Sequence, residues 1–156
     1  MRIKHSSLVL LAGFVFSLAG SLRADTWYVS QTSPQDGPGT AWTNAFHILQ
    51  DGVDAADSND VVLVTNGTYD VGGAVIGISN RVAITEAIRV QSVNGPESTL
   101  IVGQGPIGSN AVRCAYLELG AELIGVTLTN GHTYAEEADW NETCLSGWLT
   151  AIPPAV

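Results

Sequence analysis

Carboxylates are the most numerous groups in this chain that could do chemistry. Asp51, Asp54, Asp57 and Asp60 recur at every third residue, and carboxylate oxygens are ligands that Ca²⁺ prefers. Ca²⁺ needs about six to eight oxygen ligands, whereas a single acidic side of a helix is typically a solvated surface. We therefore expect no cofactor and no metal site, and Ca²⁺ bound weakly to this acidic side is the one ion the sequence suggests.

The histidines and cysteines are the other candidate ligands and nucleophiles. His47 and His132 have no partner at a spacing typical of metal ligands, so we expect a surface or boundary position for His47 and a turn for His132. Cys114 is expected to lie in the core as a small apolar residue. A disulfide with Cys144 is permitted if the chain is exported, but two free thiols are the favoured expectation.

The first 24 residues predict export. MRIKH is followed by an apolar run at 8–19 and by the small residue Ala24, which is the pattern of a secretory signal peptide. The apolar run is shorter than the about 20 residues that a spanning helix needs. We expect cleavage after Ala24, with Ala19 as the second choice. The mature protein would then lie in the periplasm, at the cell surface or outside the cell, without a membrane span.

Charge narrows the class of partner. The 156 residues carry 6 Lys+Arg and 15 Asp+Glu, for a net charge of −9. Loss of residues 1–24 removes three basic residues and no acidic one, so the mature chain has a net charge of −12 and no lysine. Nucleic acid is excluded as a partner because phosphate binding needs clustered Lys and Arg.

The segment 25–59 predicts a strand, a loop and a helix. Residues 26–29 are β-prone, 30–41 are rich in turn formers, and 42–57 have helical periodicity. The apolar positions of the predicted helix fall on one face, and they are Phe46, Leu49, Val53 and Ala56. We expect this face to pack against the strand at 61–64.

Residues 60–133 read as all-β. Strand-like runs occupy 61–64, 81–85, 87–93, 99–103, 112–119 and 122–129, and no helical pattern separates them, which excludes a doubly wound α/β sheet. Asn-Gly recurs at 66–67, 94–95 and 130–131, which suggests a repeat of stacked coils. The exposed end of such a stack must be covered, and the helix at 42–57 is in the right place to cover it.

The Asn-Gly turns also suggest how the coils stack. Aligning the last two turns places Val90 near Val126 on neighbouring strands. A competing alignment places Arg89 beside Arg113, where two like charges about 5 Å apart would repel. We therefore favour the first alignment.

Residues 36–73 carry a more specific resemblance. They resemble the N-terminal module of bacterial secreted right-handed parallel β-helix proteins of the pectate-lyase-like superfamily. The matching features are a Gly-Thr-x-Trp loop, a Leu-Gln pair in the helix and a Gly-Thr-Tyr run after a hydrophobic strand, at Gly39, Thr40, Trp42, Leu49, Gln50, Gly67, Thr68 and Tyr69. The resemblance implies a right-handed parallel β-helix of about three coils over 60–133, with 25–59 as its N-terminal cap.

The segment 134–156 departs from that family. It lacks further strand alternation and ends with a Pro-Pro pair, so we interpret it as a divergent irregular tail and the chain as truncated. Trp140 and Trp148 could form a sugar-stacking surface, but packing of the tail on an apolar surface is favoured.

The resemblance also implies which residues enzymes of this fold would use. Their lyases bind Ca²⁺ through clustered aspartates and take a proton with Arg or Lys, and the only basic candidates are Arg81, Arg89 and Arg113. An arginine on a strand is usually a solubilising side chain. The strand region offers no Asp cluster, only Glu86, Glu97, Glu118 and Glu122.

Hydrolases need paired carboxylates, and Glu118 and Glu122 flank a turn without further support for that role. We therefore assign no catalytic, cofactor-binding or metal-binding residue.

Three interpretations of function stay open. The favoured one is an exported, non-catalytic β-helix scaffold that could contact extracellular polysaccharide. The second is the N-terminal part of a polysaccharide lyase or glycoside hydrolase whose catalytic coils are missing. The third is a nonfunctional truncated product.

Overall fold

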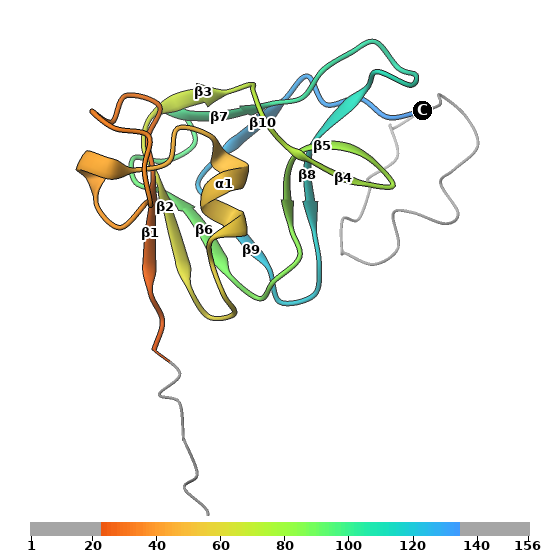
Figure 1. The fold of residues 1–156 in the computed structure, drawn as a ribbon. Helices are drawn as coiled ribbons and strands as arrows, with labels where there is room; N and C mark the ends of the chain where they lie inside the picture. The colour runs from red at the N-terminus through yellow and green to blue at the C-terminus, as the bar shows by residue number, and fades with distance from the viewer. Residues whose placement is uncertain (1–22, 135–156) are drawn as a thin grey trace, which may run out of the picture.

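The computed structural model describes residues 23–134, and these residues are folded mostly as short strands (Figure 1). The predicted signal peptide at 1–24 and the predicted tail at 134–156 therefore lie almost entirely outside the described residues. Within residues 23–134, no helix is both long and apolar enough to cross a membrane.

The strands form three sheets that are parallel except for one antiparallel pair, β4 and β5. Sheet A has the order β1-β2-β6-β9, from Thr26–Val29, Val61–Val64, Arg89–Ser92 and Glu122–Ile124. Sheet B has the order β10-β7-β3, from Thr127–Thr129, Thr99–Val102 and Gly67–Tyr69. Sheet C has the order β4-β5-β8, from Ala74–Ile76, Ile78–Ile84 and Val112–Leu117.

The chain visits the sheets in a fixed cyclic order. It runs through A, B and C as β2, β3 and β4-β5, repeats the circuit as β6, β7 and β8, and ends with β9 and β10 in A and B. Each circuit therefore lies beside the previous one and buries its apolar side chains against it. The prediction of an all-β fold without intervening helices is confirmed.

One hydrophobic core lies between the three sheets. Buried positions form rows across the strands, because a residue of one circuit is aligned with its parallel partner in the next. Such rows are Val62 and Val90 in sheet A and Tyr69 and Ile101 in sheet B, and in sheet C the core is lined by Val82 and Ile84, both on β5. Each of these side chains is at most 1% exposed, so the stacking of circuits supplies the burial that a single circuit lacks.

The helix predicted over 42–57 is shorter than expected. A 3-10 turn, Trp42–Asn44, is followed by extended backbone, and the α-helix α1 spans only Leu49–Asp54. The extended part pairs with β1, since the Phe46 N–H donates to Tyr28 O and Phe46 O accepts from the Ser30 N–H. Pairing with β1 therefore replaces the helical hydrogen bonds that the periodicity predicted.

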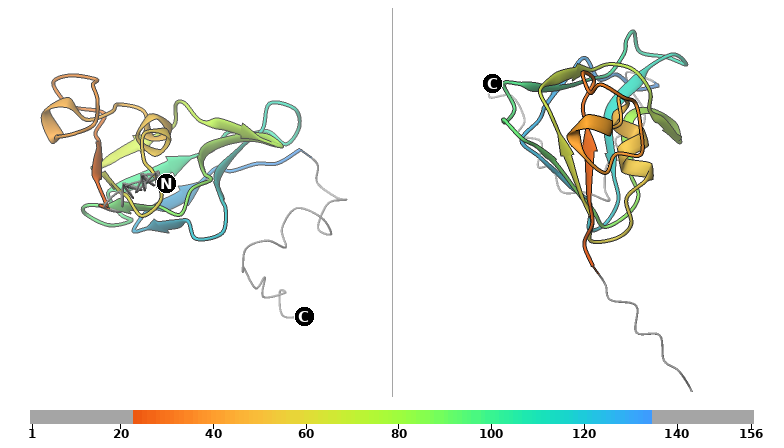
Figure 2. Two further views of the ribbon diagram at one scale, coloured as in Figure 1. Left: turned by 60° about the horizontal axis from the view of Figure 1, so that its bottom comes forward. Right: turned by 60° about the vertical axis from the view of Figure 1, so that its left-hand side comes forward.

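The predicted apolar face is nevertheless buried. Leu49, Val53 and Ala56 are at most 5% exposed, and Phe46 is half-buried against the same core. In the right-hand view of Figure 2, the segment from β1 to α1 lies in front of the strands that follow it. The prediction that this segment covers the start of the strand stack is confirmed for the four side chains.

Gln50 completes the cover of sheet C. β4 pairs with β5 only at residues 78–80, which leaves the backbone of 81–84 without a strand on that side. The Gln50 carboxamide accepts from the Ala83 N–H at 2.8 Å and donates to Ala83 O at 3.0 Å. A single side chain thus makes the hydrogen bonds to the backbone of Ala83 that a further strand would otherwise make.

The favoured alignment of the coils is wrong by three residues. Val90 is aligned with Leu123 rather than with Val126, and Arg89 is aligned with Glu122 rather than with Arg113. The alignment failed because the turns at 94–95 and 130–131 follow strands of different sheets, β6 in sheet A and β10 in sheet B. The argument against adjacent arginines holds, since Arg89 lies beside a carboxylate.

The first two Asn-Gly turns do stack. The Asn94 side chain donates to the Asn66 carboxamide oxygen at 2.7 Å, and both residues follow neighbouring strands of sheet A. Asn130 instead donates to Gly103 O at 3.4 Å. The Asn-Gly turns at 66–67 and 94–95 therefore occupy equivalent places in successive circuits, and the turn at 130–131 does not.

The strand boundaries are mostly as predicted, with two exceptions. β3 and β4 were not predicted, and the run at 122–129 is divided into β9 and β10. Gly125 has φ +67° between them, a conformation that glycine adopts readily and other residues do not. This corner moves the chain from sheet A to sheet B.

Candidate functional site

The four aspartates do not form one acidic side of a helix. Only Asp51 and Asp54 belong to α1, because the helix ends at Asp54. Burial, together with repulsion from the Asp36 and Asp54 carboxylates, raises the pKa of Asp51. Among residues 23–134, no three His, Cys, Asp or Glu side chains are grouped so that they could hold a metal ion.

Asp60 is a buried structural residue rather than part of a solvated face. Its carboxylate accepts from the Asp25 N–H at 2.8 Å, the Trp27 indole N–H at 2.9 Å and the Asp57 N–H at 3.0 Å. Burial on its own raises the pKa of Asp60, but these hydrogen bonds outweigh burial, so the pKa lies below its ordinary value. The prediction of a surface role is wrong for this residue.

Two of the three arginines are engaged within the fold. Arg81 is 6% exposed, and its guanidinium donates to Val102 O at 2.7 Å and to Gly72 O at 2.6 Å. Its predicted solubilising role is therefore wrong, because it ties sheet C to sheet B. Arg89 is exposed as predicted and forms an ion pair with Glu122 at 2.7 Å. Both guanidinium groups are therefore hydrogen-bonded to other described residues.

The other glutamates among residues 23–134 are exposed and lie apart from one another. Glu86 accepts from the Ser58 hydroxyl at 2.7 Å, and Glu118 accepts from the Tyr116 hydroxyl at 3.4 Å. Glu97 is exposed. Because Glu122 is paired with Arg89, the structure does not present it together with Glu118 as a pair of free carboxylates.

The two histidines among residues 23–134 both lie within hydrogen-bond distance of backbone carbonyl groups. His47 lies just before α1, with its Nε2 atom 3.1 Å from Ser33 O. Its Nδ1 atom lies 4.0 Å from the Asp36 carboxylate. His132 lies beyond β10, with its Nδ1 atom 3.1 Å from Asn130 O. His47 is thus a boundary residue, as the sequence indicated, although it lies outside the helix.

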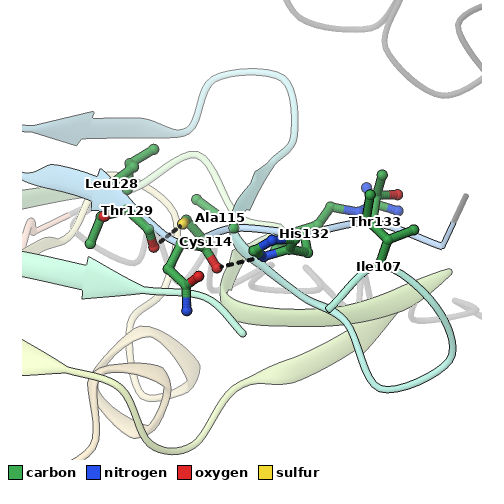
Figure 3. Close-up of a pocket in the computed structure, with 10 residues that line it drawn as sticks. Ile107, Cys114, Ala115, Leu128, Thr129, His132 and Thr133 are labelled. Atoms are coloured by element: carbon green, nitrogen blue, oxygen red, sulfur yellow. Dashed lines mark hydrogen bonds between the residues drawn. The ribbon is translucent and has the colours of Figure 1, made fainter. Parts of the chain in front are cut away.

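A hollow of about 520 Å³ lies where β8 and the end of β10 meet (Figure 3). Arg113, Cys114 and Ala115 line it from β8, Leu128 and Thr129 from β10, and His132 from the segment that follows. Cys114 is a free thiol, 9% exposed and part of the core as predicted, and its Sγ atom donates to Thr129 O at 3.1 Å.

The outer side of sheet A carries a row of uncharged side chains, most of them apolar or aromatic. Strand register aligns four residues, one from each strand, and they are Tyr28, Leu63, Gln91 and Ile124. The ring of Trp42 packs edge-on against Tyr28, with ring centroids 4.5 Å apart, and is 39% exposed. We call these five residues the outer row of sheet A.

Sequence reasoning used Trp42 only as part of a motif and did not identify the outer row. Its four strand residues alternate with the inward-facing residues of their strands, so alternation alone could have assigned these four to the outside. Alternation could not have shown that they align, because alignment depends on the register between strands.

Comparisons with protein families, with curated proteins and with solved structures found no match for this chain.

Proposed function

We propose that this chain is an exported, non-catalytic scaffold, built as a right-handed parallel β-helix, whose outer row of sheet A contacts a neutral extracellular polysaccharide. The β-helix is supported by the cyclic passage through three sheets with parallel pairing between circuits. It is supported as well by the resemblance of residues 36–73 to the N-terminal module of pectate-lyase-like proteins. Export is supported by the signal-peptide pattern at 1–24.

The observation that carries the proposal is the exposed indole of Trp42 at one end of the outer row. Aromatic rings combine a large apolar surface with little loss of conformational entropy, and sugar rings present C–H faces that pack on such surfaces. Gln91 adds an amide that can donate to or accept from hydroxyl groups. The row crosses parallel strands at a spacing of about 4.8 Å, so it presents an extended surface to an extended chain.

Electrostatics favour a neutral glycan. The outer row itself contains no charged residue, and a net charge of −12 on the mature chain repels polyuronates. The neighbouring ion pair of Arg89 with Glu122 is internally neutral. A non-catalytic role agrees with the engagement of Arg81 by backbone carbonyls and of Arg89 by a carboxylate.

The proposal is tested by measuring retention of the mature chain on insoluble cellulose, chitin and mannan, with pectate as the anionic comparison. We expect binding to a neutral glycan, weakened about tenfold by Trp42→Ala, as loss of one aromatic contact predicts. Tyr116→Ala is the matched control, since Tyr116 is an aromatic residue on sheet C rather than sheet A. Equal loss in both variants, or retention on pectate alone, would contradict the proposal.

A further inference from the structure

Asp60 carries a buried negative charge for which the described residues supply no cation. The residue is 5% exposed, and neither of the two ion pairs in the described part of the chain involves it. Buried charged groups are normally paired with an opposite charge or coordinate a metal ion. Since no group of metal ligands lies among residues 23–134, the counter-charge of Asp60 has to come from another group.

One donor to this carboxylate is the backbone nitrogen that directly follows the predicted cleavage site. The Asp25 nitrogen lies 2.8 Å from Oδ1 of Asp60. Oδ2 accepts from the Trp27 indole at 2.9 Å and from the Asp57 N–H at 3.0 Å, whereas Oδ1 accepts from no other described residue. Because a carboxylate oxygen offers two acceptor positions, Oδ1 has room for more than the one N–H that an amide supplies.

The position of this nitrogen is fixed by contacts of Asp25 and of the strand that follows. The Asp25 carbonyl oxygen accepts from the Val61 N–H at 3.0 Å, and β1 pairs with β2 from the next residue on. Arg23 and Ala24 are exposed and make no hydrogen bond with the other described residues, and Figure 1 shows the chain before β1 leading away from the strands. Removal of the chain before Asp25 should therefore leave its nitrogen beside Asp60.

We propose that cleavage of the signal peptide after Ala24 creates an α-ammonium group on Asp25, and that this group forms an ion pair with Asp60 that anchors the start of β1. Hydrolysis of the peptide bond consumes one water molecule, leaves a carboxylate on Ala24 and releases the amine of Asp25, which is protonated at neutral pH. A neutral donor thus becomes a charged one with three N–H bonds, and charge-assisted hydrogen bonds are the stronger kind. Cleavage after Ala19 would keep the amide and form no such pair. The inference rests on the proposed export and not on glycan binding.

The ion pair makes stability depend on pH in a defined direction. Besides the side chain of Asp25, the titratable and charged groups on the surrounding elements are Asp57, Glu86, Arg89 and Glu122. Arg89 is the one cation among them, and Glu122 holds it at 2.7 Å. A neighbouring carboxylate raises the pKa of an ammonium group. The stabilisation is therefore complete below the ordinary pKa of an α-amine, about 7.7–8.0, and is lost as the pH rises through the raised value.

The first test is the intact mass and the N-terminal sequence of the protein recovered after export of the whole precursor. We expect Asp25 as the first residue. Gly20 or any other first residue, or a retained signal peptide, would overturn the processing step. Failure of export would also count against the proposed function, whereas the second test does not depend on export.

The second test uses the mature chain made without export, by removal of a fusion partner with a protease that leaves Asp25 as the first residue. Because residues 25–156 contain no lysine, the α-amine is their only primary amine, and an amine-reactive succinimidyl ester reports on it alone. At pH 7 we expect labelling about tenfold slower than in a chain that begins one residue earlier, at Ala24, as a pKa raised by about one unit predicts. Asp60→Asn should restore the faster rate, and the matched control Asp57→Asn, in the same loop, should not.

Urea unfolding supplies a readout that does not depend on the Asp60→Asn variant being folded. At pH 7 the chain that begins at Asp25 should unfold at a higher urea concentration than the chain that begins at Ala24. The two midpoints should coincide at about pH 10, where the amine is neutral. Equal labelling rates of the two chains, or a difference between the midpoints that persists at about pH 10, would overturn the ion pair. A rate in Asp57→Asn as fast as in Asp60→Asn would overturn the assignment to Asp60.

Discussion

Replacement of Gln50 by alanine tests whether this side chain stabilises the uncovered edge of sheet C. The carboxamide of Gln50 is 4% exposed and makes two hydrogen bonds with the backbone of Ala83, at 2.8 and 3.0 Å. It also donates to the Asp54 carboxylate at 2.7 Å. In Gln50→Ala, the N–H and C=O groups of Ala83 lose these partners without gaining a strand.

The expected cost follows from those two backbone groups. A buried polar group without a partner costs about 1–3 kcal/mol, so two such groups cost about 2–6 kcal/mol. Because water can enter the space left by the side chain, we expect a value toward the lower end, about 3 kcal/mol. With a slope of about 2 kcal/mol per molar urea, the midpoint of unfolding falls by about 1.5 M.

The assay is urea unfolding of the mature chain, followed by hydrogen exchange of the Ala83 amide. The control is Gln104→Ala, because Gln104 is exposed and its side chain makes no hydrogen bond within the described residues. If Gln50→Ala changes the free energy of unfolding no more than the control does, the edge is not sealed by this side chain. Unchanged exchange at Ala83 would lead to the same conclusion.

Three further predictions follow from the described contacts. Phe46→Asp should destabilise the chain by about 3 kcal/mol in urea unfolding, because it removes an aromatic contact from the core and adds a charge; a change below 1 kcal/mol, on the scale of a surface substitution, would refute the burial argument. Since the pKa of Asp60 is lowered, its stabilising contribution is present above about pH 4 and is lost as the pH falls below that value. Asp60→Asn should therefore flatten the acid limb of a plot of stability against pH, and a limb as steep as in the parent chain would exclude this role. The mature chain should produce neither unsaturated uronates from pectate, alginate or chondroitin, with or without Ca²⁺, nor reducing sugar, and turnover that disappears in Arg89→Ala or Arg113→Ala would support the lyase alternative.

Much of the fold could be predicted because local patterns and tertiary packing agree. β1 and β2 were predicted at their observed bounds from short runs of residues that favour strands. The burial of Leu49 and Val53 was predicted from helical spacing, and it survived even though the helix is shorter than expected. Burial depends on which side of the segment faces the stack, whereas helix length depends on which partner takes the backbone hydrogen bonds of Phe46.

The register was not predictable from turns, because the corners of the stack do not repeat at a constant spacing. Asn66 and Asn94 occupy the same corner, whereas Asn130 follows a strand of another sheet. An alignment that treats all three turns as equivalent must therefore misplace the strands between them. The charges carry register information that the turns lack, because the observed register places Arg89 beside Glu122 and opposite charges on neighbouring strands favour such an alignment.

The candidate site depends on register in the same way, and so it emerges only from the three-dimensional arrangement. Tyr28, Leu63 and Ile124 are unremarkable as separate outward residues, and they become one surface because parallel pairing aligns them. The same register aligns Leu128 with Ile101 and leaves it exposed at the other end of the core. Strand register therefore has two consequences in this molecule. It aligns the outer row of sheet A into one surface that could bind an extended ligand. It also leaves Leu128 exposed to solvent at the end of a row whose earlier members are buried.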